Sequence, residues 1–262
     1  MLRLLGMRDL LALIKPRYHA SFVTVAVGAL LFAEPPTATL AWRLAALYLS
    51  FTVLFYGGIY TLNDLADRVE DARHPVKRLR PIASGRLGIA AAATIAVVLC
   101  GLGLALAMAI FPPSILACYA AIVALNAAYS SGGRGMFVLD VALNAAPHAV
   151  RLLMGALLVD RVPPFGHLAA WFCLAAGISC IRRLVEKEAG GETARPVLRR
   201  YSIAGLALAA DAGFVAIVGL AAAHGSSSPG FYSIAVPAYL LLVVSARRVP
   251  AAYLGFARLW LR

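Results

Sequence analysis

Long apolar stretches, separated by short polar or proline-bearing turns, recur along almost the whole chain. A bilayer core needs about 20 predominantly apolar residues per helix, and the stretches have roughly this length. The pattern therefore predicts an all-α protein, a polytopic membrane helical bundle of eight to nine transmembrane helices. The expected spans are 17–33, 40–63, 88–111, 113–130, 137–159, 165–185, 201–223 and 230–247.

The two ends of the chain lie outside these spans. Met1–Leu13 is predicted to be a short amphipathic helix on the membrane surface. The tail Val249–Arg262 is too short for a comfortable span, so it is expected to be either a ninth, shortened helix or an interfacial one. With no linker or repeat between the spans, residues 1–262 are predicted to form a single transmembrane domain.

Composition and charge support a membrane location. The chain is 62% hydrophobic and 14% charged, whereas a soluble domain carries about a quarter charged residues. The net charge is +12, and Lys and Arg gather in every second connection, as cytoplasmic loops do. We therefore expect a multi-pass protein of the cell membrane, both termini cytoplasmic for eight spans, and no nucleic-acid partner.

An acidic segment follows the second predicted span. Asp64, Asp67 and Asp71 stand at i, i+3 and i+7, so a continuing helix would place them on one face, with Tyr60 and Asn63 close by. Like charges at this spacing repel, and a divalent cation removes the penalty. Because Mg²⁺ is usually shared between one or two carboxylates and substrate phosphates, the segment predicts a magnesium–diphosphate site. The alternative is a solvated loop face.

A dense basic run comes directly after the acids. Lys77, Arg78 and Arg80 are predicted to hold the outer phosphate oxygens of the same ligand. Their alternative role is to set membrane topology and to bind anionic lipid.

Two of these motifs carry a family resemblance. Asn63-Asp64-x-x-Asp67-x-x-x-Asp71 resembles the NDxxDxxxD signature of the UbiA superfamily of intramembrane prenyltransferases, and Arg80–Gly85 resembles its RPIxSG-type stretch. In that family the acidic motifs bind Mg²⁺ and an isoprenyl diphosphate in a helical bundle open to lipid. The resemblance implies a UbiA-type fold with Asn63, Asp64, Asp67 and Asp71 as metal ligands, the three aspartates being catalytic.

Tyr56 and Tyr60 share a helical face with the acids. Their rings are expected to stabilise a cationic intermediate, Tyr60 as part of the catalytic group and Tyr56 in substrate binding. The alternative is ordinary packing in a membrane helix.

The second acidic motif of the family lies between helices six and seven, and here it departs from the pattern. The segment Ile181–Glu192 has no DxxxD. Glu186 and Glu192 are the candidate metal ligands that remain, and Arg182 one turn before Glu186 is a candidate for substrate binding. The alternative is an exposed helix end with paired charges, broken by Gly190-Gly191.

The fifth predicted span carries a polar face. Asp140, Asn144, His148 and Arg151 follow at i, i+4, i+8 and i+11. Ionisable groups in a membrane helix face the bundle interior or a water-filled cavity by default. Asp140, Asn144 and Arg151 are therefore predicted to bind substrate, whereas His148 is expected to be structural.

One branch of the family is similar in more detail. The run HPxKRxRPIA without a second DxxxD resembles the decaprenyl-phosphate phosphoribosyltransferase-like members, in which Arg134 would fall where a basic substrate-binding residue is common. The expected function is Mg²⁺-dependent transfer of a prenyl group from a prenyl diphosphate to an acceptor. The alternatives are phosphoribosyl transfer from phosphoribosyl diphosphate to a polyprenyl phosphate lipid, a UbiA-type terpene cyclase, and a membrane transporter. A homo-oligomer is left open.

Overall fold

The computed structural model describes residues 6–33, 38–73, 77–188, 192, 195–225 and 229–244. Within these ranges the chain forms helices and turns and no strand, which confirms the predicted all-α class. It divides into two compact units, which are described separately: unit 1 is Met1–Val23 with Pro35–Leu116, and unit 2 is Thr24–Glu34 with Ala117–Arg262. The single-domain organisation stays a prediction.

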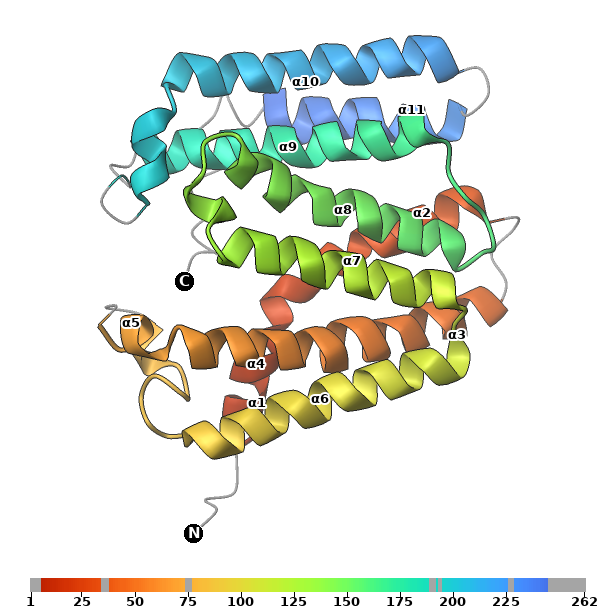
Figure 1. Ribbon diagram of the computed structural model, residues 1–262. Helices are drawn as coiled ribbons and strands as arrows, with labels where there is room; N and C mark the ends of the chain where they lie inside the picture. The colour runs from red at the N-terminus through yellow and green to blue at the C-terminus, as the bar shows by residue number, and fades with distance from the viewer. Residues whose placement is uncertain are drawn as a thin grey trace. The chain divides into compact units, whose positions relative to one another are not determined.

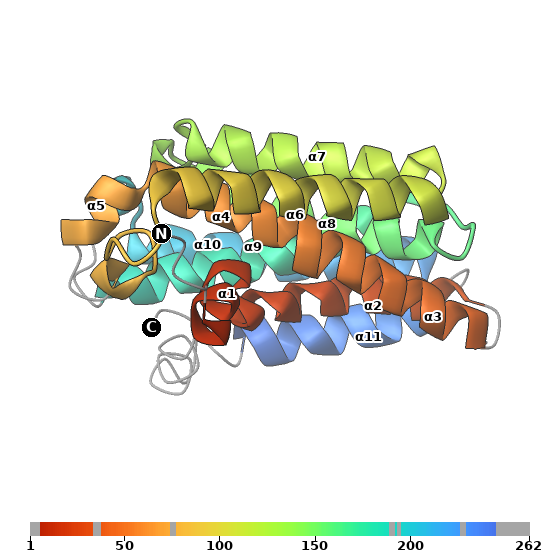
Figure 2. The ribbon, with the colours of Figure 1, turned by 90° about the horizontal axis from the view of Figure 1, so that it is seen from below.

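Unit 1 is built around one long helix and a second helix beside it. The long helix runs without interruption through α3 (Ala38–Leu47), the π-helical η2 (Tyr48–Phe55) and α4 (Tyr56–Ala66). α6 (Ile89–Ile110) packs alongside it in both views (Figures 1 and 2). The shorter elements are α1 (Met7–Ile14), the 3-10 helix η1 (Pro16–Phe22), α5 (Arg68–Arg73) and the 3-10 helix η3 (Lys77–Leu79).

Two glycines let α6 approach the long helix closely. A Cβ at Gly58 would lie 2.7 Å from the Ala96 carbonyl oxygen, and one at Gly103 would lie 2.6 Å from the Phe55 amide nitrogen. Small residues at such contacts are the usual means of packing membrane helices, since lipid tails provide no hydrophobic force between helices.

Unit 2 is a bundle with α9 (Phe165–Glu188) near its centre. α9 lies between α8 (Leu139–Leu157) and α10 (Ile203–His224), and α11 (Pro229–Tyr239) also packs on it (Figure 1). Its core is made by Trp171, Leu174, Leu206, Phe231 and Tyr239. The other elements are η4 (Gly133–Gly135), η5 (Pro196–Arg200) and the π-helical η6 (Leu240–Val244). Most of α2 (Val23–Phe32) and of α7 (Pro113–Ser130) also belongs to unit 2, but Val23 and Pro113–Leu116 are counted in unit 1.

The predicted helices agree with the observed ones to within a few residues, apart from one. The prediction of a helix over 113–130 matches α7, and the predictions over 88–111, 165–185 and 201–223 match α6, α9 and α10 closely. The predicted span 17–33 instead divides into the 3-10 helix η1 and the ten-residue α2.

Fewer helices than expected meet the requirements for a membrane span. Five of the described helices are long and apolar enough: Ala38–Ala66, Ile89–Ile110, Pro113–Ser130, Phe165–Glu188 and Ile203–His224. α2 is too short, and α8 carries the predicted polar face. The helix expected at 230–247 is apolar over Gly230–Val244 but also short, and the tail 249–262 and residues 1–5 lie outside the described residues.

Candidate active site

The end of the long helix in unit 1 carries a cluster of buried acids and basic side chains, here named the carboxylate cluster (Lys15, Asp64, Asp71, Lys77 and Arg80). One guanidinium nitrogen of Arg80 contacts both acids, at 2.8 Å from Asp64 Oδ1 and 2.7 Å from Asp71 Oδ2. Lys15 Nζ lies 2.7 Å from the same Asp64 oxygen, and Lys77 Nζ lies 3.4 Å from Asp71 Oδ1. The cluster thus joins four separate stretches of unit 1 around two carboxylates.

The chain bends at Asp67, which explains why the three acids do not share one environment. α4 ends at Ala66 and Asp67 adopts φ −83°, ψ 1°, outside helical geometry, before α5 begins at Arg68. The Asp67 amide donates to the Asn63 carbonyl and the Asp71 amide to the Asp67 carbonyl, so the i to i−4 bonding continues across the bend. Asp64 and Asp71 are buried, whereas Asp67 is half-buried and Asn63 is exposed.

The predicted trio of clustered carboxylates is therefore reduced to a pair. Nowhere in the described part of the chain do three or more His, Cys, Asp or Glu side chains gather as a potential metal site. Asp64 and Asp71, 3% and 2% exposed, meet around Arg80 instead.

One oxygen of this pair has no hydrogen-bond partner among the described residues. Asp64 Oδ2 is buried and unbonded, while Asp64 Oδ1 contacts both Lys15 and Arg80. Leaving a buried carboxylate oxygen unpaired costs free energy, so such an atom suggests a ligand site. Burial lowers the pKa of the Lys15 ammonium, and the Asp64 carboxylate opposes that shift.

The two predicted aromatic residues lie next to this cluster. The Tyr60 ring centroid is 5.2 Å from Lys15 Nζ and 5.2 Å from the Tyr56 ring centroid. Tyr18 completes the row, with its ring centroid 5.5 Å from that of Tyr60. These rings form an aromatic wall beside Asp64.

The basic run is only partly drawn into the carboxylate cluster. Lys77 and Arg80 contact the acids, with 44% and 27% of their side chains exposed. Arg78 is exposed on η3, and His74–Val76 lie outside the described residues.

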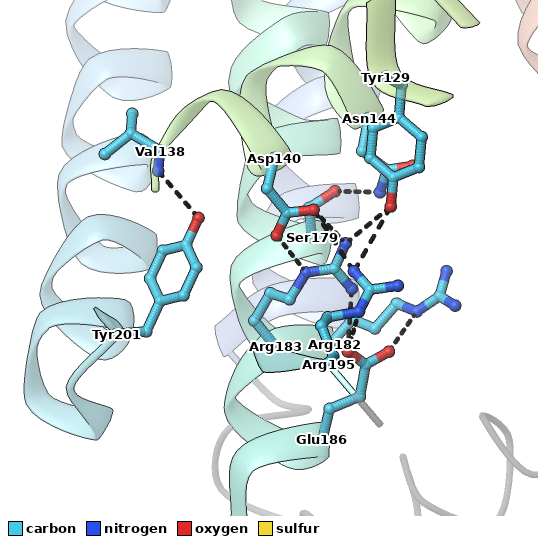
Figure 3. Close-up of polar contacts among 10 residues, drawn as sticks. All are labelled: Tyr129, Val138, Asp140, Asn144, Ser179, Arg182, Arg183, Glu186, Arg195 and Tyr201. Atoms are coloured by element: carbon cyan, nitrogen blue, oxygen red, sulfur yellow. Dashed lines mark hydrogen bonds and ion pairs between the residues drawn. The ribbon is translucent and has the colours of Figure 1, made fainter. Parts of the chain in front are cut away.

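Unit 2 contains a second cluster of charges, here named the arginine cluster (Tyr129, Asp140, Arg182, Arg183, Glu186 and Arg195; Figure 3). At its centre Arg183 of α9 binds Asp140 of α8 through two parallel contacts, Nε to Oδ2 at 2.6 Å and a terminal nitrogen to Oδ1 at 2.9 Å. The two side chains are 1% and 0% exposed. Such a two-point pair in a buried setting is geometrically specific.

Further arginines surround the second acid of this cluster. Glu186 accepts from Arg182 Nε and from a terminal nitrogen of Arg183, each at 3.0 Å. Arg195 lies 3.4 Å from Asp140 Oδ1 and 3.5 Å from Glu186 Oε2. Arg183 and Arg195 also donate to the Tyr129 hydroxyl oxygen. Every carboxylate oxygen of Asp140 and Glu186 therefore contacts a guanidinium group.

The remaining predicted residues of unit 2 are dispersed. Asn144 donates to the Ser179 hydroxyl of α9 at 2.9 Å, which is a bond between helices, and Arg151 is buried in α8. Arg134 is exposed in η4. Glu192 pairs with Lys187, whose hydrogen bond holds the pKa of the Glu192 carboxyl below its usual range.

Sequence reasoning missed Lys15, Arg183 and Arg195 as site residues. Arg183 had a detectable signal, because it follows the buried Ser179 and Cys180 by four and three residues and so shares their helical face. Lys15 has no comparable local signal, since its partner Asp64 is 49 residues away.

Known proteins resemble this chain in both sequence and fold. The model of the family described as "UbiA prenyltransferase family" matches residues 21–253. Nodulation protein NoeC of Azorhizobium caulinodans is 34% identical over 182 residues, which is 66% of this chain and 59% of that protein. Decaprenyl-phosphate phosphoribosyltransferase of Corynebacterium glutamicum is 32% identical over 136 residues, or 51% of this chain and 40% of that enzyme. The chain thus spans less than two thirds of the length of these relatives.

Among solved structures, a UbiA homolog from Archaeoglobus fulgidus bound to GPP and Mg²⁺ superposes with a TM-score of 0.74. The match covers 92% of this chain and 87% of that one at 17% sequence identity. At that identity the likeness is one of fold.

Proposed function

Because this chain belongs to the UbiA prenyltransferase family, we propose that it is a magnesium-dependent transferase embedded in the membrane. It breaks the bond between a carbon and a diphosphate leaving group and joins that carbon to an acceptor. The observation that carries the proposal is the buried pair Asp64 and Asp71 around one Arg80 nitrogen, with Asp64 Oδ2 free of hydrogen bonds among the described residues.

The residues present fit a magnesium–diphosphate complex. Two carboxylates suffice, because Mg²⁺ keeps several waters and completes its shell with substrate phosphates. Asp64 and Asp71 would hold the ion, and Asp67 and Asn63, at the adjacent bend, are the further oxygen ligands that the motif provides. The relative whose structure contains GPP and Mg²⁺ shares this fold.

When bound, the metal would neutralise charge on the departing diphosphate. Lys15, Lys77 and Arg80 now neutralise the two acids, and they would exchange carboxylate oxygens for phosphate oxygens when the complex binds. Tyr60 and Tyr56 would shield the cation-like carbon from water and stabilise it with their ring faces.

The arginine cluster is better suited to an anion than to a second metal. All four carboxylate oxygens of Asp140 and Glu186 already contact arginine, whereas Asp64 Oδ2 in the carboxylate cluster has no hydrogen-bond partner among the described residues. Three guanidinium groups face two carboxylates there. We therefore assign to Arg182 and Arg195, which are 42% and 27% exposed, the role of binding a phosphate group of a substrate. The buried Asp140–Arg183 pair would keep α8 and α9 in position around them.

This observation favours phosphoribosyl transfer to a polyprenyl phosphate over prenyl transfer to a neutral aromatic acceptor. In that reaction the carbon–oxygen bond to diphosphate breaks and a phosphate oxygen of the lipid forms the new bond to the sugar carbon. The relatives named decaprenyl-phosphate phosphoribosyltransferase support the same choice. Prenyl transfer from a prenyl diphosphate remains the second candidate, supported by the family.

We also propose that the connections rich in Lys and Arg face the cytoplasm, as their distribution along the sequence indicates. The donor would then be taken from the cytoplasm and the lipid from the surrounding membrane.

The test supplies purified protein in detergent with Mg²⁺ and either phosphoribosyl diphosphate plus decaprenyl phosphate, or a prenyl diphosphate plus candidate acceptors. Released diphosphate and a new lipid mass are measured. We expect a phosphoribosylated lipid, and no product once EDTA removes the metal. Absence of diphosphate release from every donor by a well-folded sample would overturn the proposal, and a prenylated product alone would select the second candidate.

A further inference from the structure

Unit 2 has a pocket that the proposed reaction does not use. It has a volume of about 320 Å³ and lies at the first turn of α9, where its walls include Phe32, Arg161, His167 and Phe231. His167 and Arg183 are sixteen positions apart in α9, a distance of about 24 Å along the helix. The pocket is therefore a separate site from the arginine cluster.

One residue of the pocket wall, His167, and its neighbour Tyr232 are buried polar groups that lack hydrogen-bond partners within the described residues. His167 is 1% exposed, and neither of its ring nitrogens is bonded. The Tyr232 hydroxyl, on a side chain that is 4% exposed, is also unbonded. Buried polar groups are nearly always paired, because leaving them unpaired costs free energy. Two unpaired groups in one place therefore indicate a ligand with hydrogen-bonding atoms.

Aromatic rings hold the imidazole in place. The His167 ring centroid lies 4.3 Å from that of Phe231, 5.3 Å from Tyr232 and 5.6 Å from Phe32. Because the ring is packed against three aromatic side chains, its two nitrogens are the atoms that serve recognition.

The charged side chain in the pocket lining favours an anion. Arg161 contributes a cation to the pocket lining, and α9 begins at Phe165, so the amide groups of its first turn provide partial positive charge. Helix N-termini of this kind are common binding sites for phosphate.

The surroundings favour an anion attached to an apolar chain. Leu31, Phe32 and Phe231 give the pocket apolar walls. Beside it, Val162 in the connection between α8 and α9 and Phe165 at the start of α9 are 77% and 83% accessible. Large exposed apolar side chains next to a cation are typical of a surface that meets the headgroup region of a membrane.

We propose that this pocket binds the phosphate headgroup of a membrane lipid, with His167 as hydrogen-bond partner and Arg161 as the counter-charge. The ligand is a phosphate-bearing amphiphile whose chain contacts Leu31 and Phe32. It is bound as a structural or regulatory lipid and takes no part in group transfer.

The chain supplies its own fluorescent reporter for a test. Its three tryptophans are Trp42, Trp171 and Trp260, and Trp171 has its ring centroid 6.2 Å from that of Phe231 in the pocket wall. In the full chain with Trp42→Phe and Trp260→Phe, only Trp171 fluoresces. A short-chain phosphatidic acid with brominated acyl chains, added in a neutral detergent, should quench it in a saturable manner.

Substitutions in the pocket should weaken that binding. His167→Phe should raise the half-saturating concentration about tenfold or more, because hydrogen bonds to a charged group are among the stronger ones. Arg161→Gln should raise it severalfold. Arg200→Gln, which removes an exposed arginine of η5 far from the pocket in sequence, is the matched control and should leave it unchanged. Melting temperature and diphosphate release report that each variant is folded.

Three outcomes would overturn the proposal. Quenching that does not saturate, or that is equal in the parent and His167→Phe, would show that the pocket binds no such lipid. Equal quenching by brominated diacylglycerol would show that the phosphate is not recognised. Full displacement of the lipid by millimolar inorganic phosphate would show that a free anion, rather than a lipid, occupies the site.

Discussion

The two charge clusters of the molecule contain similar groups but are built differently. In the carboxylate cluster a single nitrogen of Arg80 connects two acids, and Asp64 Oδ2 stays unbonded. In the arginine cluster Arg183 binds Asp140 through two contacts in a setting without solvent access, and all oxygens of Asp140 and Glu186 contact arginine.

This difference indicates that the carboxylate cluster can exchange its contacts for those of a ligand. The buried Asp140–Arg183 pair cannot do so without a large loss of stability. Single contacts from partly exposed cations such as Lys77 and Arg80 can be replaced by a ligand that reaches the acids from solvent. A buried two-point pair is costly to break, because its loss leaves one charge unpaired inside the protein. Substitutions in the carboxylate cluster of unit 1 are therefore expected to lower activity. Substitutions in the Asp140–Arg183 pair of unit 2 are expected to lower the stability of the fold.

The largest expected effect comes from breaking the Asp140–Arg183 pair. Arg183→Met leaves Asp140 buried without its partner and should lower the free energy of unfolding by about 3–5 kcal/mol, measured by thermal or denaturant unfolding in detergent. Arg182→Met, at a 42% exposed neighbour, should change it by less than about 1 kcal/mol. Adding Asp140→Leu to Arg183→Met should recover much of the loss. If Arg183→Met is as stable as the parent protein, the Asp140–Arg183 pair does not stabilise the fold.

The next effect concerns catalysis. Asp64→Asn removes a charged ligand from the carboxylate cluster and should reduce diphosphate release on the order of 10²–10³-fold, the size seen when one transition-state contact is lost. Its melting temperature should change far less than that of Asp140→Asn. Asp9→Asn, which breaks an exposed ion pair with Arg86 in the same unit, is the control and should retain activity. Equal stability losses in Asp64→Asn and Asp140→Asn would remove the contrast between the clusters.

A smaller effect should come from a close helix contact elsewhere in unit 2. A Cβ at Gly155 of α8 would collide with the Val25 carbonyl oxygen of α2, so Gly155→Ala should cost about 1–3 kcal/mol of unfolding free energy. At Gly219 of α10 no atom lies within 4 Å of an added Cβ. Gly219→Ala should therefore be neutral or stabilising by roughly 0.5–1 kcal/mol. Unfolding of both variants checks this, and a destabilised Gly219→Ala would argue against the packing.

The smallest effect tests whether a bound Mg²⁺ takes the place of the Arg80 cation between the two acids. Arg80→Gln removes the cation from between the two acids, so Mg²⁺ alone should bind about fivefold more tightly, while diphosphate in the presence of Mg²⁺ binds more weakly. Arg78→Gln, at an exposed site in the same basic run, should leave binding of Mg²⁺ alone unchanged. Isothermal titration calorimetry measures both. Weaker binding of Mg²⁺ alone in Arg80→Gln would contradict the idea that Arg80 occupies the position of a cation.

Much of the architecture followed from local pattern. Apolar runs such as 113–130 and 203–224 predict helices because burying their side chains in lipid needs every backbone group paired within the helix. The acidic motif could also be predicted from local pattern. Asp64 and Asp71 stand two helical turns apart, so their spacing alone places them on one side of a helix. Even the Asp64–Asp71 pairing survives a bend that the pattern did not predict.

What the sequence by itself determined was therefore the helical class, the membrane setting and the acids at the end of the second long helix. Only the tertiary structure decided which cations from distant parts of the chain meet the buried acids Asp64 and Asp140. Lys15 reaches Asp64 across 49 residues, and Arg183 reaches Asp140 across 43. Such pairs depend on how helices pack, and no periodicity within one segment encodes the partner. The packing also brought Arg195 to Glu186, whereas Arg182 and Arg183 stand four and three residues before Glu186 in the same helix, so their contacts with it follow from local spacing.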